Sequence, residues 1–436
     1  MLPFMGVDAL NSTRAATRRP TASPLALDLA VYVAFCGYAV AVAFTSEFYG
    51  FRMWGAFASA GYGLAALHSA WLLTQRTRAG WRHSRWLGMA AVGLLAMLVP
   101  LVFLVIRRLT GVDWLITPYS WSAQPEVWVI ERSASLLLHH GTPYVDVTAL
   151  GRPPEVNDYT PYGPIMSLFG LPRALFGGTP VTDALTDARL MFALTACVCA
   201  WITLSLMGRP RVPVRAAHLA VACPLTALTW SVAGPDLAIV GLLLVAGALA
   251  ARDRPVASAI VLALVVSAKL IVAPAAVVLA ALIAARLGAR AFARFLAALV
   301  AAVAIFNIPV LLVDPSAFIE HVIRFPAGLG VVTSPAASPL PGYLVASTGA
   351  AGKAIAFTLL GAAAIAIVAW LLRRPPVTGS DAMLRIAIGL GAFAILTPAT
   401  RYGYLVYPLV LLGAMLCFRR AEEKTPIGTT TFSSSG

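Results

Sequence analysis

Long apolar runs without charge recur along almost the whole of this 436-residue chain, and many of them approach 20 residues. A helix of about that length crosses the hydrocarbon core of a bilayer. With 60% hydrophobic and only 11% charged residues, the chain is not an ordinary soluble domain. The runs predict an all-α polytopic membrane protein with about 12 transmembrane segments: 27–45, 54–74, 86–106, 187–207, 214–232, 235–251, 256–267, 271–285, 295–313, 354–372, 383–399 and 403–418.

The net charge of +14 is distributed unevenly between alternate loops. With the N-terminus in the cytoplasm, the tails and loops on that side hold 21 of the 32 Lys and Arg residues but only 6 of the 18 acids. This is the positive-inside pattern of multi-span membrane proteins. The basic balance therefore reports topology in a cell (plasma) membrane, where membrane lipids are the surrounding partners. It argues against nucleic-acid binding.

Polar groups gather on the opposite, extracytoplasmic side. The connections that emerge there are the long segment 107–186, the turn 233–236, the break at Lys269, the loop 314–353 and the turn 397–404. A connection of about 80 residues is much longer than a linker needs and indicates an ordered, functional loop. A membrane enzyme with an outward-facing site explains this asymmetry. A transporter is the alternative, but it would place its ionisable groups within the spans.

The segment 107–186 contains two patterns of short helices. Pro125 suits the first position of a helix, apolar residues then recur at helical spacing, and Gly141 is placed to end the helix as a C-cap. Glu126 falls in the first turn of this helix. The stretch 163–178 is too short and too broken to cross the membrane. Both helices should therefore lie at the membrane surface.

Several motifs resemble the glycosyltransferase C superfamily. An acid and an amphipathic run ending in "GTPY" precede "DYTPYGPIMSLFGLP" in the first outer loop, and "GPDLAIVGLLLVAGALAARDRP", "VSAKLIVAP" and "RYGYLVYP" follow. The set is similar to family-87 glycosyltransferases, the polyprenyl-phosphate-mannose-dependent mannosyltransferases of actinobacteria. The resemblance covers a catalytic transmembrane domain over residues 86–418. Residues 1–26 would be a cytoplasmic N-terminal tail, 27–85 an additional transmembrane hairpin, and 419–436 a disordered cytoplasmic tail.

This resemblance implies a reaction. A sugar would pass, with inversion and without a metal or cofactor, from a polyprenyl-phosphate donor to an acceptor hydroxyl on the extracytoplasmic side. The acceptor would be a glycolipid or glycan of the cell envelope. Mannose is favoured by the resemblance, with arabinose behind it. The alternative from another class is a transporter or flippase for a lipid-linked sugar, which also needs cations near a phosphate but no carboxylate at an outer surface helix.

The acceptor hydroxyl must lose a proton, which requires a carboxylate or histidine within hydrogen-bond reach. Glu126 matches the position of the family's outer-loop acid, which is usually aspartate and therefore one methylene shorter. Asp113, in "GVDWL", is the rival base. His321, in "AFIEHVIRF", could act as base or relay. Their structural alternatives are a helix-terminal acid favoured by the macrodipole, an interfacial loop acid and a solvated histidine.

The leaving phosphate gains negative charge, which requires fixed cations. Lys269 and Arg401 are the expected phosphate ligands, and Arg324 is a further candidate. Lys269 could instead extend to the interface, and Arg401 could be an interfacial anchor. The stretch "NDYTPYGP" offers further candidate substrate ligands for sugar hydroxyls, as an alternative to a turn with interfacial aromatic residues: Asp158, Tyr159 and Tyr162.

Overall fold

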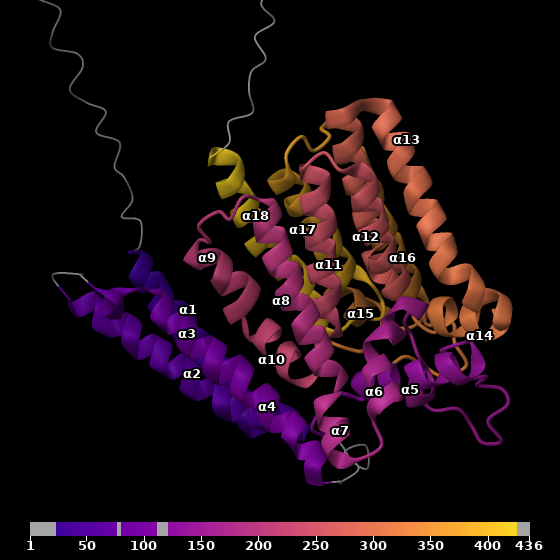
Figure 1. Cartoon of the computed structure of the whole chain (residues 1–436), viewed down its shortest axis with the longest axis horizontal. Coiled ribbons are helices and arrows are strands. Elements are labelled where there is room, and N and C mark those ends of the chain that lie inside the picture. Colours follow the sequence, from indigo (N-terminus) through magenta and orange to yellow (C-terminus); the bar gives the residue numbers. More distant parts are fainter. Residues whose placement is uncertain (1–22, 76–79, 111–120, 425–436) are drawn as a thin grey trace, which may run out of the picture.

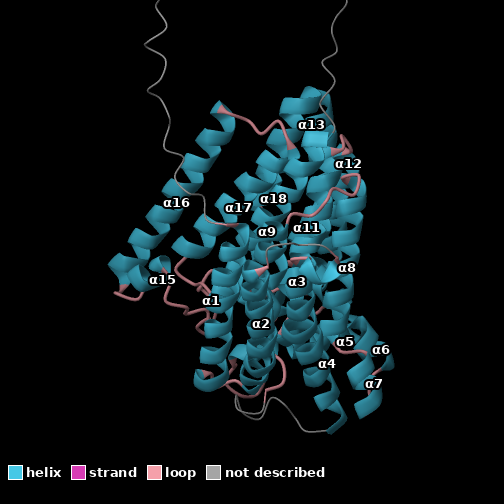
Figure 2. Cartoon of the chain, turned by 90° about the vertical axis from the view of Figure 1, so that its left-hand side faces the viewer, coloured by secondary structure: helices cyan, strands magenta, loops and turns pink. Residues whose placement is uncertain are grey.

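The computed structural model describes residues 23–75, 80–110 and 121–424. Within these ranges the regular structure is helical, apart from an isolated bridge between Ala337 and Thr400. The long helices run side by side as a bundle, and short helices cover one of its ends (Figures 1 and 2). The prediction of an all-α, polytopic membrane protein is therefore confirmed.

Proline sets the start of many helices, because its missing N–H costs nothing at the first helical position. The α-helices, several of which begin at Pro, are α1 (Pro24–Thr45), α2 (Tyr49–Thr74), α3 (Trp86–Val92), α4 (Val99–Ile106), α5 (Pro125–His140), α6 (Leu171–Phe176), α7 (Pro180–Leu185), α8 (Ala188–Leu206), α9 (Val214–Ala217), α10 (Pro224–Val232), α11 (Pro235–Ala251), α12 (Pro255–Ala268), α13 (Pro274–Val313), α14 (Pro315–Ile319), α15 (Pro341–Ala346), α16 (Ala350–Arg373), α17 (Gly379–Leu396) and α18 (Val406–Lys424).

The number of spans differs from the expected 12. The described part of the chain has seven helices long and apolar enough to cross a membrane, or up to eight if the bent pair α10 and α11 is one span. The difference arises because hydropathy reports apolar length and not the path of the chain. Helices α10 and α11 meet at 115°, α12 has only 14 residues, and the 40 residues of α13 are divided at Gly288, where φ is 79°.

Helices α1 and α2 form a hairpin that packs against the rest of the bundle. A Cβ on Gly55 would lie 2.6 Å from the Ala39 carbonyl oxygen, so the close approach of the two helices requires glycine. The Tyr62 hydroxyl donates to the Ala222 carbonyl at 2.6 Å. Because hydrogen bonds of this kind are not exchanged with water in lipid, they fix the hairpin to the later helices.

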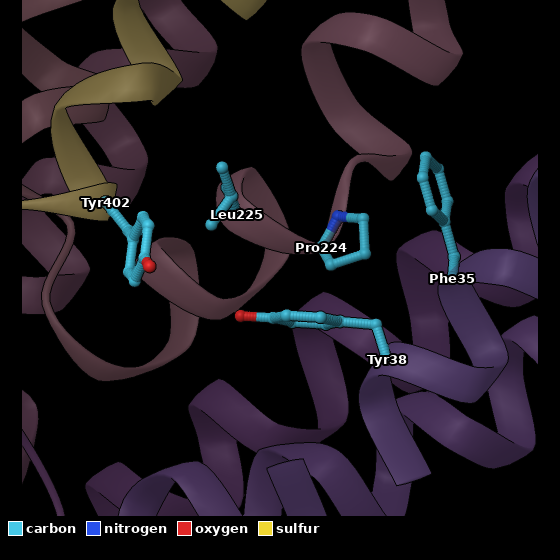
Figure 3. Close-up of a pocket in the computed structure, with 5 residues that line it drawn as sticks. All are labelled: Phe35, Tyr38, Pro224, Leu225 and Tyr402. Atoms are coloured by element: carbon cyan, nitrogen blue, oxygen red, sulfur yellow. The ribbon is translucent and has the colours of Figure 1, made fainter. Parts of the chain in front are cut away.

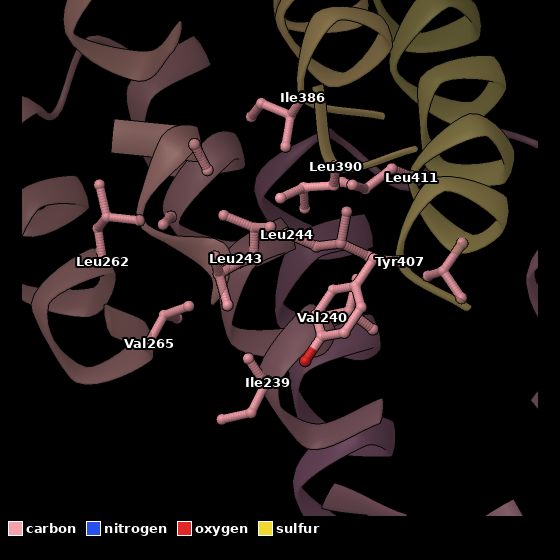
Figure 4. Packing of buried hydrophobic residues seen from close by; sticks show 14 of the residues in the cluster. Ile239, Val240, Leu243, Leu244, Leu262, Val265, Ile386, Leu390, Tyr407 and Leu411 are labelled. Carbon is pink, nitrogen blue, oxygen red and sulfur yellow. The ribbon is translucent and has the colours of Figure 1, made fainter. Parts of the chain in front are cut away.

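Helix α11 is the centre of the bundle and is buried along almost its whole length. A helix that is apolar on all sides is expected in such a position. Helices α8, α12, α17 and α18 contact it, and Ile239 and Leu243 pack in the same cluster as Leu390 of α17 and Tyr407 of α18 (Figure 4). This core holds the N-terminal end of α11 in place.

The predicted helix in the long connection is confirmed as α5, and Gly141 ends it with φ 72°. The stretch 163–178 forms a 3-10 helix, η6 (Pro164–Gly170), followed by α6. These elements lie with α7 and α14 at one end of the bundle, opposite the end where the chain leaves α18 (Figure 1). That end is where most of the polar candidates converge.

Candidate active site

Two acids and two cations from four separate segments lie close together at this end of the bundle. Glu126 stands in the first turn of α5 and Asp236 in the first turn of α11. Lys269 is the extended residue that separates α12 from the short helix η8 (Leu270–Val272). Arg401 directly precedes the 3-10 helix η10 (Tyr402–Leu405). We call these four residues the charged cluster.

Asp236 and Lys269 form its buried centre. They are 6% and 7% exposed, and the Lys269 ammonium donates a hydrogen bond to Asp236 Oδ1. The Tyr407 hydroxyl donates to the same oxygen at 2.6 Å. A buried charge is costly in a membrane protein unless it is paired, so each of these residues supplies the partner that the other requires, and the pair holds both side chains in one position.

Breaks in the apolar helices create this arrangement. Gly234 has φ 93°, a left-handed conformation that favours glycine, and Pro235 follows as the first residue of α11. The chain turns sharply there and places the first turn of α11, including Asp236, at this end of the bundle. Lys269 has an extended conformation, with φ −148° and ψ 110°, and Pro274 starts the next long helix.

Tyrosine rings surround the ammonium of Lys269. Its Nζ lies 5.6 Å from the ring centroid of Tyr162, 5.2 Å from that of Tyr404 and 6.0 Å from that of Tyr407. Rings within about 6 Å attract a cation through their quadrupole. The three rings therefore stabilise the Lys269 ammonium.

Glu126 joins the cluster through Tyr162, whose hydroxyl donates to Glu126 Oε2 at 3.0 Å. Burial raises the pKa of Glu126 above its ordinary value of 4.5, and the charge of Asp236 raises this pKa further. The charges of Lys269 and Arg401 oppose that rise. Asp236, Lys269 and Arg401 therefore all lie within electrostatic reach of Glu126. Lys269 and Arg401 thus both lie near Glu126, as the sequence predicts.

Gly163 lets the segment before η6 approach the break at Lys269. Its N–H donates to the Ala268 carbonyl at 2.9 Å, and a Cβ on Gly163 would overlap the Ser267 carbonyl oxygen. Because this obstacle is backbone, it cannot rotate away. The absence of a side chain at Gly163 therefore brings the neighbouring Tyr162 to both Glu126 and Lys269.

Gly163→Ala is expected to move Tyr162 away from the cluster and to lower the rate of the protein's reaction about tenfold, because overpacking costs about 1–3 kcal/mol. Turnover by purified protein is the measurement. Gly389→Ala in α17 is the matched control, since a Cβ there meets nothing within 4 Å. Equal rates for the two variants would contradict a positioning role for Gly163.

A buried ion network fixes α5 to the start of α8. Arg108 donates to Glu131 of α5 at 2.8 Å and to Asp187 at 2.5 Å. Asp187 also accepts from Arg189 at 2.8 Å, and both residues are fully buried. Glu131 accepts from the Ala188 N–H at 3.1 Å. This agrees with a structural rather than a catalytic role for Glu131.

The remaining sequence candidates belong to a second group, between the loop before η6 and the segment after α14. The Asp158 carboxylate is paired with Arg152 at 2.7 Å. Tyr159 is 1% exposed, stacks on Phe325 with ring centroids 4.1 Å apart, and donates to Glu320 at 3.1 Å. Arg324 is exposed and lies 3.3 Å from the same Glu320.

His321 lies inside this second group and is 0% exposed. Its Nδ1 accepts from the Thr160 N–H at 2.8 Å, and its Nε2 lies 2.8 Å from the Val145 carbonyl, to which it can only donate. Burial lowers the pKa of His321 to about 4, so the ring is neutral near pH 7. With its lone pair already used, His321 is placed to join two loops.

Asp113 lies outside the described residues. Asp236, Tyr404 and Tyr407 were not among the site residues predicted from the sequence. The signal for Asp236 was present, because an acid directly after Gly234 and Pro235 interrupts an apolar run, and Lys269 needs a buried partner. Among the described residues, no group of three or more His, Cys, Asp and Glu side chains is placed to hold a metal ion.

The fold and the site define a multi-span helical membrane protein with a partly buried cluster of acids and cations at one end. A family model for glycosyltransferase family 87 matches residues 159–400, which is more than half of the chain. The chain therefore belongs to glycosyltransferase family 87 and is a membrane glycosyltransferase. No curated protein and no solved structure gives a significant match.

Proposed function

We propose that this enzyme transfers a sugar, mannose by family resemblance, from a polyprenyl-phosphate donor to a hydroxyl of a cell-envelope glycolipid or glycan. The reaction would take place on the extracytoplasmic side of the plasma membrane, with inversion and without a metal. The observation that supports it best is the charged cluster, in which Lys269 and Arg401 lie within electrostatic reach of Glu126. Cations for a phosphate and a base for an alcohol are what this chemistry requires.

In the proposed step the acceptor oxygen forms a bond to the anomeric carbon while the bond from that carbon to the phosphate oxygen breaks. The acceptor proton passes to Glu126. The bonding electrons leave with the polyprenyl phosphate, which gains one negative charge. Lys269 and Arg401 stabilise this charge, and Asp236 keeps the Lys269 ammonium in place between reactions.

Glu126 is preferred as base because, of the candidate bases that the structure describes, it alone belongs to the charged cluster. We propose that Tyr162, whose hydroxyl bonds Glu126 and whose ring faces Lys269, orients the sugar. His321 would instead support the loops at the rim of the site. Asp158, Tyr159 and Arg324 would do the same through their pairs with Arg152, Phe325 and Glu320.

Purified protein in lipid nanodiscs, supplied with radiolabelled polyprenyl-phosphate-mannose and an envelope lipid extract, tests this proposal. Radiolabel should move to an acceptor and polyprenyl phosphate should be released. The same protein in sealed vesicles tests the flippase alternative. Movement of intact donor across the bilayer without any transfer would overturn the proposed function.

Replacing Lys269 by alanine is expected to weaken binding of the lipid-phosphate donor at least about tenfold, because a hydrogen bond to a charged group contributes about 1.5–3 kcal/mol. Equilibrium binding of polyprenyl phosphate measures this. The double variant Lys269→Met with Asp236→Asn removes the buried pair together, so it guards against misfolding from an unpaired aspartate. Arg286→Ala, which breaks a surface pair with Asp253, is the matched control. Unchanged affinity in the double variant would remove Lys269 from the phosphate site.

A further inference from the structure

A cavity of about 520 Å³ separates the N-terminal hairpin from the later helices (Figure 3). It is lined by Phe35 and Tyr38 of α1, by Pro224 and Leu225 in the first turn of α10, and by Tyr402 of η10. Its volume falls within the range of about 300–1,000 Å³ that small-molecule sites occupy. Helix α1 lies outside residues 159–400, the part of the chain that the family model matches.

The lining suits a hydrocarbon chain. It contains no charged side chain, and its polar atoms are the hydroxyl groups of Tyr38 and Tyr402, which point into the same space (Figure 3). These two residues are 41% and 46% exposed, so the cavity is open at the surface of the bundle. Helix α1 is long and apolar enough to cross the membrane, and lipid chains would then surround a cavity that opens beside it.

The cavity adjoins the charged cluster through consecutive residues. Arg401 directly precedes Tyr402, which is the first residue of η10. The charge of Arg401 lowers the pKa of Glu126, whereas Tyr402 lines the cavity. The Tyr402 N–H donates to Ser338 Oγ at 3.0 Å, which holds this segment in place.

From this arrangement we infer that the cavity holds the isoprene units nearest the phosphate of the lipid donor, and that helix α1 supplies part of the lipid site. The inference rests on the proposed function. If Arg401 binds the phosphate of the donor, the attached hydrocarbon chain begins next to the cavity, because the following residue, Tyr402, lines it. This proximity to a fixed cation favours a lipid that carries a phosphate over an uncharged occupant such as an apolar helix of a second copy, and competition with phosphatidylglycerol distinguishes the donor from bulk phospholipid.

Photo-crosslinking of the full-length protein in phosphatidylcholine nanodiscs tests the site directly. The probe is a polyprenyl phosphate with a diazirine in its first isoprene unit. Label is expected on the peptides that contain Tyr38 and Leu225, and unlabelled decaprenyl phosphate should suppress it. Label found only elsewhere would overturn the inference. Equal suppression by phosphatidylglycerol, which would indicate a general lipid surface, would also overturn it.

Filling the cavity provides the second test. Leu225→Trp is expected to weaken binding of decaprenyl phosphate about tenfold, through loss of buried apolar contact. Binding of mannose 1-phosphate, which has no lipid chain, should not change. The matched control is Leu64→Trp, in a separate cavity of about 370 Å³ between α2 and α3, and it should change neither affinity. Equal loss of both ligands in Leu225→Trp would contradict a role for the lipid chain.

The two proposals can fail separately. Wild-type protein that crosslinks in the cavity but transfers no sugar would leave the lipid site standing and remove the transferase mechanism. Wild-type protein that transfers sugar but crosslinks elsewhere would leave the mechanism and remove the site between α1 and α10.

Discussion

Glu126→Gln is expected to lower the rate of sugar transfer about 10²–10⁴-fold while leaving donor affinity close to that of the wild type, since general-base catalysis contributes rate factors of this size. Glutamine has the same length and can still accept the hydrogen bond from Tyr162. It cannot take the proton of the acceptor hydroxyl. Single-turnover transfer and equilibrium binding of polyprenyl phosphate, measured on the same preparations, separate the two effects.

The pH profile sharpens this test. Burial and the Asp236 charge raise the pKa of Glu126, and the base works only when it is deprotonated. The rate should therefore fall as the pH is lowered through that raised pKa, and the glutamine variant should lack this limb. Glu126→Asp should retain measurable activity because it keeps the carboxylate. Glu47→Gln, at an exposed acid between α1 and α2, should change nothing. If Glu126→Gln transferred sugar at the wild-type rate, Glu126 would not be the base and Asp113 would become the next candidate.

The local features of the site could be predicted from the sequence, because single residues determine them. Proline at the first position and glycine beyond the last one define α5. The placement of Glu126, Lys269 and Arg401 at one end followed from counting crossings and charges.

The contacts between residues at distant helix breaks could not be predicted from the sequence. Asp236 and Lys269 are 33 residues apart, and their pairing depends on the packing of α11 against α12. A hydropathy pattern contains no information on which helices are neighbours. For the same reason the sequence suggested a base or relay, or else a solvated histidine, at His321, whereas two backbone groups from another segment form hydrogen bonds with its ring.

The second large effect is expected at Arg189, which holds the segments of both acids. Its guanidinium donates to the Ser122 carbonyl at 2.9 Å and to the Ser231 carbonyl at 3.4 Å. Ser122 lies just before α5, which carries Glu126, and Ser231 lies near the end of α10, just before the turn that leads to Asp236. Arg189→Met should reduce stability by about 3–5 kcal/mol, the cost of breaking a buried ion pair. A fall in the thermal unfolding temperature of the purified protein measures this loss.

Positioning is separated from stability by Arg189→Lys, which keeps the charge but loses the planar fork that reaches Asp187 and the carbonyls together. We expect the lysine variant to fold, to bind donor nearly as well as the wild type, and to transfer sugar about tenfold more slowly, since tenfold corresponds to about 1.4 kcal/mol. Arg85→Lys is the matched control. Arg85 donates two similar hydrogen bonds to Asp28 in the N-terminal part of the bundle. Weakening this pair should lower the unfolding temperature but should not lower the turnover of the protein that remains folded. If both variants slow transfer equally, Arg189 stabilises the bundle but does not set the distance between the two acids.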